Sequence, residues 1–333
     1  MWGSRLNFKS RRGALAVVLA GFVALSAATT AIGTVMIERA NPATGRLLPV
    51  AGGVLHVVEK TPAGGAEGRP VVVLIHGAAA NLHDQEAALG DRLSERYRVL
   101  IVDRPGHGWS TPGTGPEGST PRGEAAIIHE ALQTLGVTGF VLLGHSWGGT
   151  LATTYALDYP QDLTGLVLLS PVAFPWSAGT AWYYDVGATP IVGPAFAHLF
   201  ALPTGLFLTP FAVQLVFSPN DPPPDYVTRA SARLALRPSE FLANAREVSG
   251  LKTFVAGQAA RYPALNVPTV IISGAADTVV PPNVHARRLA AVLPHARLVL
   301  LPGVGHMPHY IATDRVVAAV TELTENNKTK AMP

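Results

Sequence analysis

The sequence predicts an α/β fold with a mostly parallel, doubly wound sheet and a helical insertion. Short runs rich in Val, Ile and Leu alternate with helical patterns, as in repeated βα units with right-handed crossovers. Several runs are continuously apolar, which is typical of strands covered by helices on both faces. The alternation stops between about 172 and 263, and this interruption predicts the insertion.

Length and composition favour one large domain around a substantial core. The chain has 333 residues, of which 48% are hydrophobic and only 14% charged, a balance that argues against disorder. It contains no cysteine. Disulfides, thiolate metal sites and a cysteine nucleophile are therefore excluded.

The net charge of +3 is concentrated at the N-terminus. Residues 1–40 carry a net charge of +4, and the remaining residues, with 20 basic and 21 acidic groups, carry −1. The body thus lacks the basic patch of a nucleic-acid-binding protein, and no nucleic-acid partner is expected.

The first forty residues read as a membrane-targeting segment. Residues 13–37 form 25 consecutive residues without a charge, and roughly 20 apolar residues are enough to span a bilayer. A basic cluster (Arg5, Lys9, Arg11 and Arg12) precedes this run and should remain cytoplasmic. The apolarity through Ile37 favours an uncleaved, single-pass signal anchor in the inner (plasma) membrane, with the body on the extracytoplasmic side. A cleaved signal peptide, with small residues at 26–28, is the alternative and would give a secreted or periplasmic protein.

The strand and helix patterns define the organisation of the chain. Strands are predicted at 54–59, 71–75, 99–102, 140–143, 166–169, 269–273 and 297–301, and helices at 84–96, 122–135, 147–158, 283–292 and 312–324. The predicted parts are a basic N-terminus (1–12), a transmembrane segment (13–37), a turn-rich linker (38–52), an α/β core (53–171 and 264–325), a helical lid (172–263) and a C-terminal tail (326–333). Eight of the eleven phenylalanines lie in the lid. Such aromatics shape an apolar, water-excluding pocket or form the insertion's own small core.

The strongest chemical motif is a G-x-S-x-G sequence formed by Gly144, His145, Ser146, Trp147 and Gly148. An apolar strand precedes it and a helical pattern follows. The flanking glycines suit a tight, strained turn that presents the serine hydroxyl, and the helix start directs positive potential at developing negative charge. The motif predicts Ser146 as a nucleophile.

A serine nucleophile needs a base, and the base needs an orienting acid. The last predicted strand runs into a Gly-rich turn that ends in His306, which we expect to be the base; His309, just beyond this turn, is less favoured. The strand at 269–273 leads to Asp277, 29 residues before His306, as the expected acid. The order Ser, Asp, His is the one found on strand–turn–helix nucleophile sites.

Two backbone amides should form the oxyanion hole. One is the amide of Trp147, directly after the nucleophile. The other is expected from Ala78, in the loop after the strand at 71–75, where Gly77 lets the backbone approach the substrate. His76 is interpreted as a structural residue that bonds within this loop.

With these motifs the sequence resembles the α/β-hydrolase superfamily over residues 53–325. The segment from Asp103 to Ser110 (DRPGHGWS) is similar to the D-x-x-G-x-G-x-S turn of esterases, epoxide hydrolases, dehalogenases and cofactor-free haloperoxidases. The resemblance implies a sheet of about eight strands, a lid inserted after the sixth strand, and a triad matching Ser146, Asp277 and His306. It also implies that Asp103 ties the loop beneath the oxyanion hole.

These features predict a serine hydrolase that cleaves a small apolar carboxylic ester, as a carboxylesterase or lipase does, through an acyl-enzyme. No metal or organic cofactor is implied, because P-loop, dinucleotide and H-E-x-x-H motifs are missing from the sequence. Alternatives are a cofactor-free haloperoxidase or perhydrolase, a C–C bond hydrolase, and a non-catalytic ligand-binding homologue. An epoxide-hydrolase-like enzyme is a further alternative, since Tyr183 and Tyr184 could correspond to the lid tyrosines of those enzymes. At the nucleophile position, however, this chain has serine where those enzymes have aspartate.

Overall fold

In the computed structural model, which describes residues 8–115 and 117–331 and the side chains within 13–115 and 117–325, the chain forms an eight-stranded sheet. Its strand order is β1-β2-β4-β3-β5-β6-β7-β8. β2 pairs antiparallel with both its neighbours, and the pairs from β4 to β8 are parallel. The α/β class and the mostly parallel sheet are therefore confirmed. The strands are β1 (Arg46–Val50), β2 (Gly53–Lys60), β3 (Val71–Ile75), β4 (Arg98–Val102), β5 (Phe140–His145), β6 (Leu163–Leu169), β7 (Thr269–Gly274) and β8 (Ala296–Leu301).

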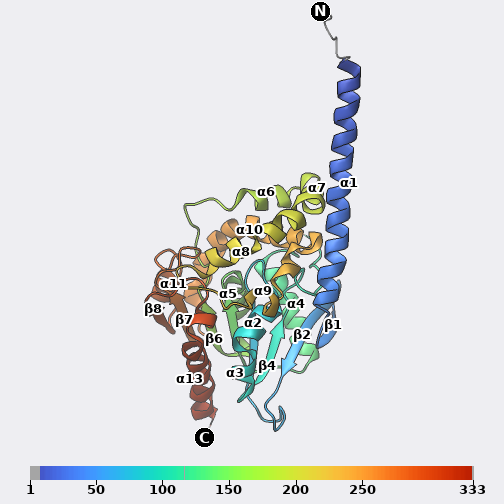
Figure 1. Cartoon of the computed structure of the whole chain (residues 1–333). Coiled ribbons are helices and arrows are strands. Elements are labelled where there is room, and N and C mark those ends of the chain that lie inside the picture. The colour runs from blue at the N-terminus through green and yellow to red at the C-terminus, as the bar shows by residue number, and fades with distance from the viewer. Residues whose placement is uncertain (1–7, 116, 332–333) are drawn as a thin grey trace, which may run out of the picture.

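Helices cover both faces of this sheet (Figure 1). One face packs against α4 (Pro121–Thr134), α5 (Trp147–Asp158) and α11 (Ala286–Val292). The other packs against α2 (Leu82–Gln85), the π-helical turn η1 (Glu86–Gly90), α3 (Asp91–Ser94) and α13 (Thr313–Ala331). Alternate residues of a central strand enter different cores: Val73 and Ile75 lie in one, Val72 and Leu74 in the other. Burial on both faces explains why these strands are continuously apolar.

Three boundaries differ from the sequence prediction. α1 (Phe8–Ala40) continues three residues past the predicted end at 37, and the predicted linker 38–52 contains the edge strand β1. A five-residue strand carrying Pro49 has little strand signal, and proline is tolerated there because an edge strand needs fewer backbone donors. α13 extends through Ala331 into the predicted tail 326–333, since no glycine or proline interrupts the sequence before Pro333. Residues 1–7 of the predicted basic N-terminus lie outside the described residues.

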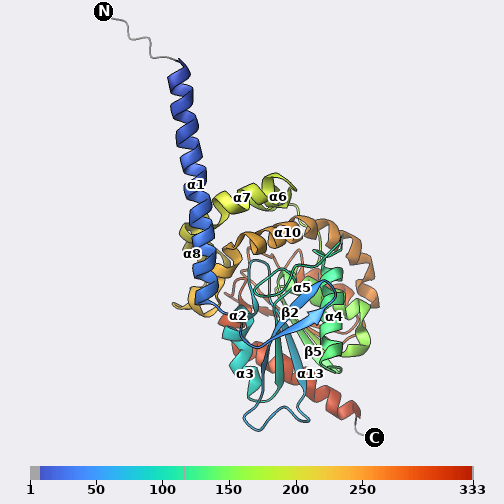
Figure 2. The same cartoon turned by 90° about the vertical axis from the view of Figure 1, so that its right-hand side faces the viewer.

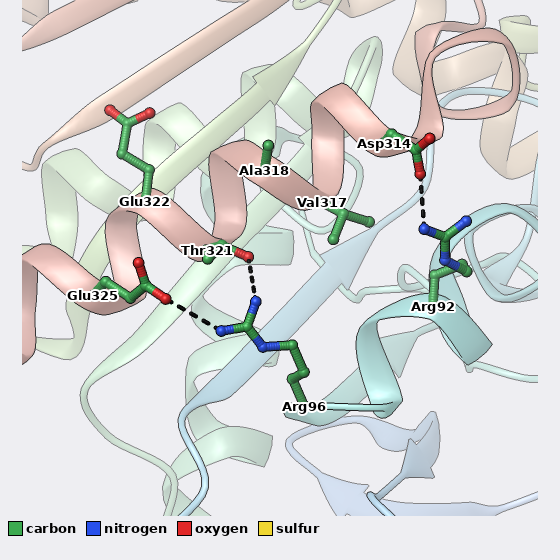
Figure 3. Close-up of a pocket in the computed structure, with 8 residues that line it drawn as sticks. All are labelled: Arg92, Arg96, Asp314, Val317, Ala318, Thr321, Glu322 and Glu325. Carbon is green, nitrogen blue, oxygen red and sulfur yellow. Dashed lines mark hydrogen bonds and ion pairs between the residues drawn. The ribbon is translucent and has the colours of Figure 1, made fainter.

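α13 is held against the sheet mainly by its apolar face. Val316, Val320 and Leu323 are buried in the core beneath it. At the solvent edge, ion pairs to α3 and to the turn after it line a shallow groove. Arg92 Nη2 of α3 lies 2.7 Å from Asp314 Oδ1, and Arg96 Nη2 of the turn lies 3.2 Å from Glu325 Oε1 (Figure 3). Exposed pairs of this kind contribute about 0–1 kcal/mol each, so the apolar contacts dominate.

The lid is inserted in the sequence between β6 and β7. It lies over the carboxyl ends of the parallel strands (Figures 1 and 2). It contains α6 (Trp182–Ala188), α7 (Val192–Phe196), the π-helical turn η3 (Ala197–Ala201), α8 (Leu202–Phe217), α9 (Tyr226–Arg229) and α10 (Pro238–Gln258). α1 runs along the side of the lid and continues beyond it (Figure 2). Within the described residues, two helical segments, 13–40 and 192–217, are long and apolar enough to cross a membrane by length and composition.

A buried arginine joins the sheet to the lid. Arg104, after β4, is fully buried and donates to Glu124 of α4, with Nε 2.9 Å from Oε2. Its Nη2 contacts Glu247 of the lid helix α10, and its Nη1 donates to the carbonyl of Gly77 at 3.0 Å. The guanidinium lies 3.7 Å from the ring centre of Trp147. One cation thus bonds to three segments that are far apart in sequence.

Two carboxylates share this single cation. Burial raises the pKa of Glu247 well above its usual range, Arg104 partly opposes the rise, and the neighbouring Glu124 adds to it. Burial raises the pKa of Glu124 as well, so both acids depend on the one guanidinium. Such a cluster is stable only while the guanidinium is present.

Replacing Arg104 should destabilise the protein far more than replacing a surface arginine. Arg104→Met leaves two buried carboxyl groups without their cation, and we expect a loss of about 3–5 kcal/mol in the free energy of unfolding. Arg122→Met is the matched control, because the Arg122–Asp158 pair is half exposed, and its loss should stay within about 1 kcal/mol. Urea unfolding of the full chain in detergent measures both. Similar losses for the two variants would contradict the role assigned to Arg104.

Candidate active site

Ser146 occupies a strained turn between β5 and α5. Its backbone has φ +53° and ψ −117°, a conformation that costs energy for any residue with a side chain. A Cβ at Gly144 would lie 2.2 Å from the carbonyl oxygen of Gly148, and one at Gly148 would lie 2.3 Å from that of His76. The turn therefore closes only with glycine at these two positions, which is the physical basis of the G-x-S-x-G spacing.

The structure brings the three predicted residues Ser146, His306 and Asp277 into one hydrogen-bonded chain. His306 Nε2 lies 3.0 Å from Ser146 Oγ, and His306 Nδ1 lies 2.8 Å from Asp277 Oδ2. The other carboxylate oxygen of Asp277 accepts the amides of Val279 and Val280 at 2.9 and 2.8 Å. All three residues are buried. Because Asp277 can only accept, His306 carries its proton on Nδ1 and presents Nε2 to the serine hydroxyl.

The loop after β3 lies beside Ser146. A Cβ at Gly77 would lie 3.3 Å from the serine Cβ, so glycine permits the close approach. His76 donates from Nδ1 to the carbonyl of Gly77 at 2.8 Å and accepts the amide of Arg104 at 3.0 Å. Burial, followed by the charge of Arg104, lowers the pKa of His76 to about 4. His76 is therefore neutral and bonded within the loop.

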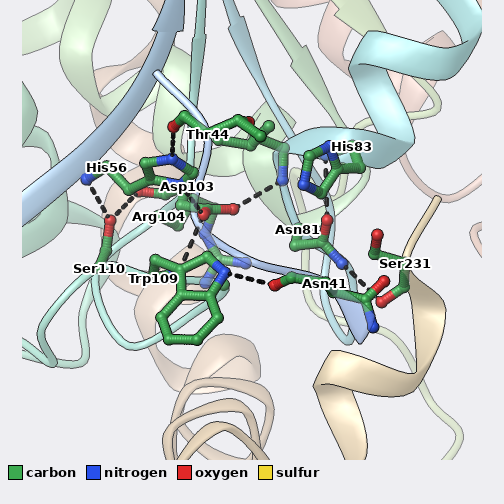
Figure 4. A network of polar contacts seen from close by, with 12 residues as sticks. Asn41, Thr44, His56, Asn81, His83, Asp103, Arg104, Trp109, Ser110 and Ser231 are labelled. Carbon is green, nitrogen blue, oxygen red and sulfur yellow. Dashed lines mark hydrogen bonds and ion pairs between the residues drawn. The ribbon is translucent and has the colours of Figure 1, made fainter. Parts of the chain in front are cut away.

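Asp103 connects this loop to its surroundings (Figure 4). One carboxylate oxygen accepts the amide of Leu82 at 2.7 Å, where α2 begins, and the other lies 2.6 Å from His56 Nδ1 and accepts the amide of Trp109 at 3.0 Å. Its carbonyl accepts the hydroxyl of Ser110 at 2.7 Å. The loop after β3 is thereby tied to β2 and to the turn after β4.

The two predicted amide donors lie on either side of Ser146. Trp147 follows it in the chain, and Ala78 belongs to the loop after the neighbouring strand β3. Ala78 lines the same cavity as Ser146 and His306. Trp147 is the first residue of α5, where backbone N–H groups have no partner within the helix. The next amide of the loop, that of Ala79, donates to Asn244 of α10 at 2.7 Å, which fixes the loop against the lid.

A second buried polar group, not predicted from the sequence, lies beneath the first. His309 Nε2 lies 3.1 Å from Asp84 Oδ2, and the hydroxyl of Tyr226 donates to the other oxygen at 3.0 Å. His145 donates from Nε2 to the carbonyl of His306 at 2.9 Å. His309, the less favoured base in the sequence, thus contacts Asp84 and not Ser146.

The charges of this second group are set by burial and by its own contacts. Burial alone would raise the pKa of Asp84, but the charge of His309 and its hydrogen bond outweigh this and lower the pKa to about 2. Burial, with the charges of His309 and His306, holds the pKa of His145 well below its usual range. Ligand atoms of Asp84, His145 and His309 lie within 4.8 Å of one another, and Asp84 and His309 are hydrogen-bonded to each other.

Ser146 opens into a mainly apolar cavity of about 340 Å³ beneath the lid. Its walls come from the loop after β3, from α6 and α8, and from the chain around His306. The side chains that line it from the lid include Tyr183, Tyr184, Thr209, Ala212, Val213, Val216, Phe217 and Tyr226. A cavity of this size and lining suits a small ligand with an apolar part.

Among proteins of known sequence, several relatives share most of this chain. Residues 70–313 match the family described as alpha/beta hydrolase fold. A Cronobacter turicensis RutD protein, named as a carbamate hydrolase, is 30% identical over 74% of this chain and 88% of its own. Lipase 1 of Psychrobacter immobilis is 27% identical over 80% and 77%. The chain spans less than half the length of a proline iminopeptidase of Xylella fastidiosa, 31% identical over 42% of this chain and 44% of that protein.

Solved structures show the same fold. A hydrolase from Pseudomonas aeruginosa PA01 superposes with a TM-score of 0.67 at 25% identity, over 85% of this chain and 99% of its own. An enol-lactonase from Burkholderia xenovorans gives a TM-score of 0.68 at 21% identity, over 84% and 100%. With the eight-stranded sheet, the serine turn and the inserted lid already described, these matches lead to one conclusion: the chain belongs to the α/β-hydrolase family.

Proposed function

We propose that this α/β hydrolase cleaves a carboxylic ester with an apolar acyl or alcohol part, through an acyl-enzyme on Ser146. The observation that carries the proposal is the hydrogen-bonded chain from Asp277 through His306 to Ser146, which ends in an apolar cavity. Each member is already within hydrogen-bond distance of the next. A serine so placed can lose its proton to the imidazole while it attacks a carbonyl carbon.

In the first half-reaction Ser146 Oγ attacks the ester carbonyl and His306 Nε2 takes its proton. Asp277 stabilises the resulting imidazolium through the bond to Nδ1. The negative charge that develops on the carbonyl oxygen would be met by the amides of Ala78 and Trp147, and loss of one such donor typically lowers kcat by about 10²–10³. His306 then gives its proton to the leaving alcohol, and the acyl group remains on Ser146.

In the second half-reaction water replaces the alcohol. His306 accepts a proton from water, which attacks the acyl carbonyl, and returns that proton to Ser146 as the carboxylic acid leaves. The carbonyl of His306 accepts a hydrogen bond from the neutral ring of His145, which fixes the backbone of the proposed base.

The cavity supports an apolar substrate. α8 contributes Ala212, Val213 and Val216 to its wall, and burial of acyl chain against such side chains is favourable by about 0.8 kcal/mol per CH₂ group. Tyr183 and Tyr184 of α6 contribute to the same lining. The similarity to a protein named Lipase 1 agrees with an ester substrate.

We further propose that α1 is an uncleaved signal anchor, which places the hydrolase on the extracytoplasmic side of the inner membrane. The support is a helix that remains apolar from Gly13 to Ile37 and continues without a break to Ala40, beside a basic N-terminal sequence. A cleaved signal sequence is the alternative, and the mass of the mature chain distinguishes the two.

Replacing the serine should abolish ester hydrolysis. For the full chain in detergent, assayed with p-nitrophenyl esters of increasing chain length, we expect Ser146→Ala to lower kcat by roughly 10⁶-fold, because no nucleophile remains. Labelling by a fluorophosphonate should disappear with it. Ser94→Ala, a change on α3 away from the cavity, is the matched control and should keep both. If the wild-type protein neither hydrolyses the esters nor is labelled by the fluorophosphonate, the catalytic assignment is wrong and a ligand-binding homologue is favoured.

Replacing the acid should slow the reaction without unfolding the site. Asp277→Asn keeps the size of the side chain but cannot stabilise the imidazolium, and we expect kcat to fall by about 10⁴-fold at neutral pH. Asp158→Asn, on the surface end of α5, should leave kcat unchanged. A loss below tenfold for Asp277→Asn would mean that another group orients His306.

The same preparations, given peroxide, halide and a carboxylic acid, measure the perhydrolase alternative.

A further inference from the structure

The outer surface of the lid is strongly apolar where a water-facing surface would be polar. Residues 172–217 contain a single charged side chain, Asp185. Ile191 is 86% exposed and Phe207 73%, and the exposed set also includes Trp182, Val192, Phe211 and Leu215. We call these six residues the lid face. Single exposed apolar residues are normal on a soluble protein, but so many large ones within 172–217 are typical of an interaction surface.

α1 packs against the lid through a stripe of small side chains. Ser26 and Thr30 are buried there, and the hydroxyl of Ser26 donates to the carbonyl of Leu199 in η3. A Cβ at Gly33 would lie 2.8 Å from a methyl group of Leu202. Small and hydroxyl residues at a helix contact are typical of helices that associate inside a membrane, where lipid removes the hydrophobic reason to pack larger side chains.

The length of α1 places this contact at membrane depth. Every residue from 13 to 25 is exposed, and Ser26 is the first buried one. These thirteen residues are about 20 Å long at ~1.5 Å per residue, whereas the hydrocarbon core is about 30 Å thick. To span it, α1 needs a further ~10 Å, which is the stretch packed on the lid. The lid must then enter the bilayer beside α1.

The orientation of the molecule agrees with this depth. α6 and α7 form the part of the body nearest the N-terminal half of α1, and α13 lies at the opposite end (Figure 1). The ring of Phe22 lies 6.2 Å from that of Phe200 in η3, so the contact begins in the apolar part of α1. The stretch ends at Glu38, whose carboxylate lies 3.3 Å from Arg237 Nη1, where charged groups would meet the membrane surface.

We propose that the lid face is immersed in the membrane leaflet farther from the basic N-terminus, in contact with lipid acyl chains, so that the body is held by the lid as well as by α1. The occupant of this surface is lipid and not a second copy of the chain. Lipid alone meets both observations, because the bilayer that α1 enters reaches η3 and α8, which pack against α1, and α6 and α7, which lie nearer its N-terminal half (Figure 1).

For the ester hydrolase proposed above, this placement has a consequence that rests on that function. α8 turns Phe207 and Phe211 outward, while Thr209, Ala212 and Val213 line the cavity of Ser146. One helix therefore separates the bilayer from the reacting serine. An apolar ester dissolved in the membrane would reach the cavity past this helix without crossing water.

The test reads position and not activity, so its failure is distinct from failure of the proposed hydrolysis. Because the natural chain has no cysteine, single substitutions suffice: Ile191→Cys and Phe207→Cys on the lid face, Leu19→Cys as the inserted control and Gln133→Cys as the water-exposed control. Gln133 lies at the end of α4 that precedes β5, at the edge of the sheet opposite the lid. Each full-length variant is labelled with an environment-sensitive fluorophore (nitrobenzoxadiazole) and reconstituted in phosphatidylcholine–phosphatidylglycerol vesicles.

We expect blue-shifted emission, and loss of intensity with doxyl-labelled phosphatidylcholine, at Leu19, Ile191 and Phe207 but not at Gln133. Water-like, unquenched emission at either lid position, with Leu19 quenched, would overturn the proposal and leave α1 as the only membrane contact. Blue-shifted emission that lipid does not quench, together with cross-linking between cysteines of two chains, would overturn it in favour of a face between copies.

Discussion

The buried guanidinium of Arg104 is the interaction on which the arrangement of the site depends. It joins the turn after β4 to α4, to the lid helix α10, to the carbonyl of Gly77 and to the ring of Trp147. The segments that carry Ala78 and Trp147 are therefore both linked to the lid through Arg104, and the bond from Ala79 to Asn244 adds a second link for the loop. Burying a charged guanidinium costs free energy unless all its donors are hydrogen-bonded. Displacement of any one of its partners should therefore destabilise this arrangement.

Around this centre the residues of the candidate site are held in place by their neighbours. The strained backbone of Ser146 is kept by close packing of Gly144 and Gly148. The ring of His306 is oriented by Asp277, and its backbone carbonyl accepts a hydrogen bond from His145. Asp84 and His309 are hydrogen-bonded to each other. Such preorganisation in a water-poor setting is the usual source of catalytic stabilisation in enzymes that use backbone donors.

The lid has two apolar surfaces, one that lines the cavity and one that faces outward. On α8 the side that carries Val213 and Val216 lines the cavity, and the side that carries Phe207 and Phe211 faces outward beside α1. A helix that is apolar all round normally belongs in a core or a bilayer. The contact with α1 through Ser26, Thr30 and Gly33 links this helix layer to the apolar N-terminal helix.

The sequence by itself determined what depends on local patterns. Continuous apolar runs identified the buried strands, and the turns that end them identified Ser146, Asp277 and His306, because parallel strands bring their carboxyl ends to one edge. Only the tertiary structure decided contacts between distant segments with no local signal: β1 pairs at the sheet edge despite Pro49, Asp84 meets His309 across 225 residues, and Glu247 reaches Arg104 across 143. From the sequence alone, an acid, a histidine or an arginine is expected on the surface. Only the packing of the sheet against the lid shows which of them are buried and paired.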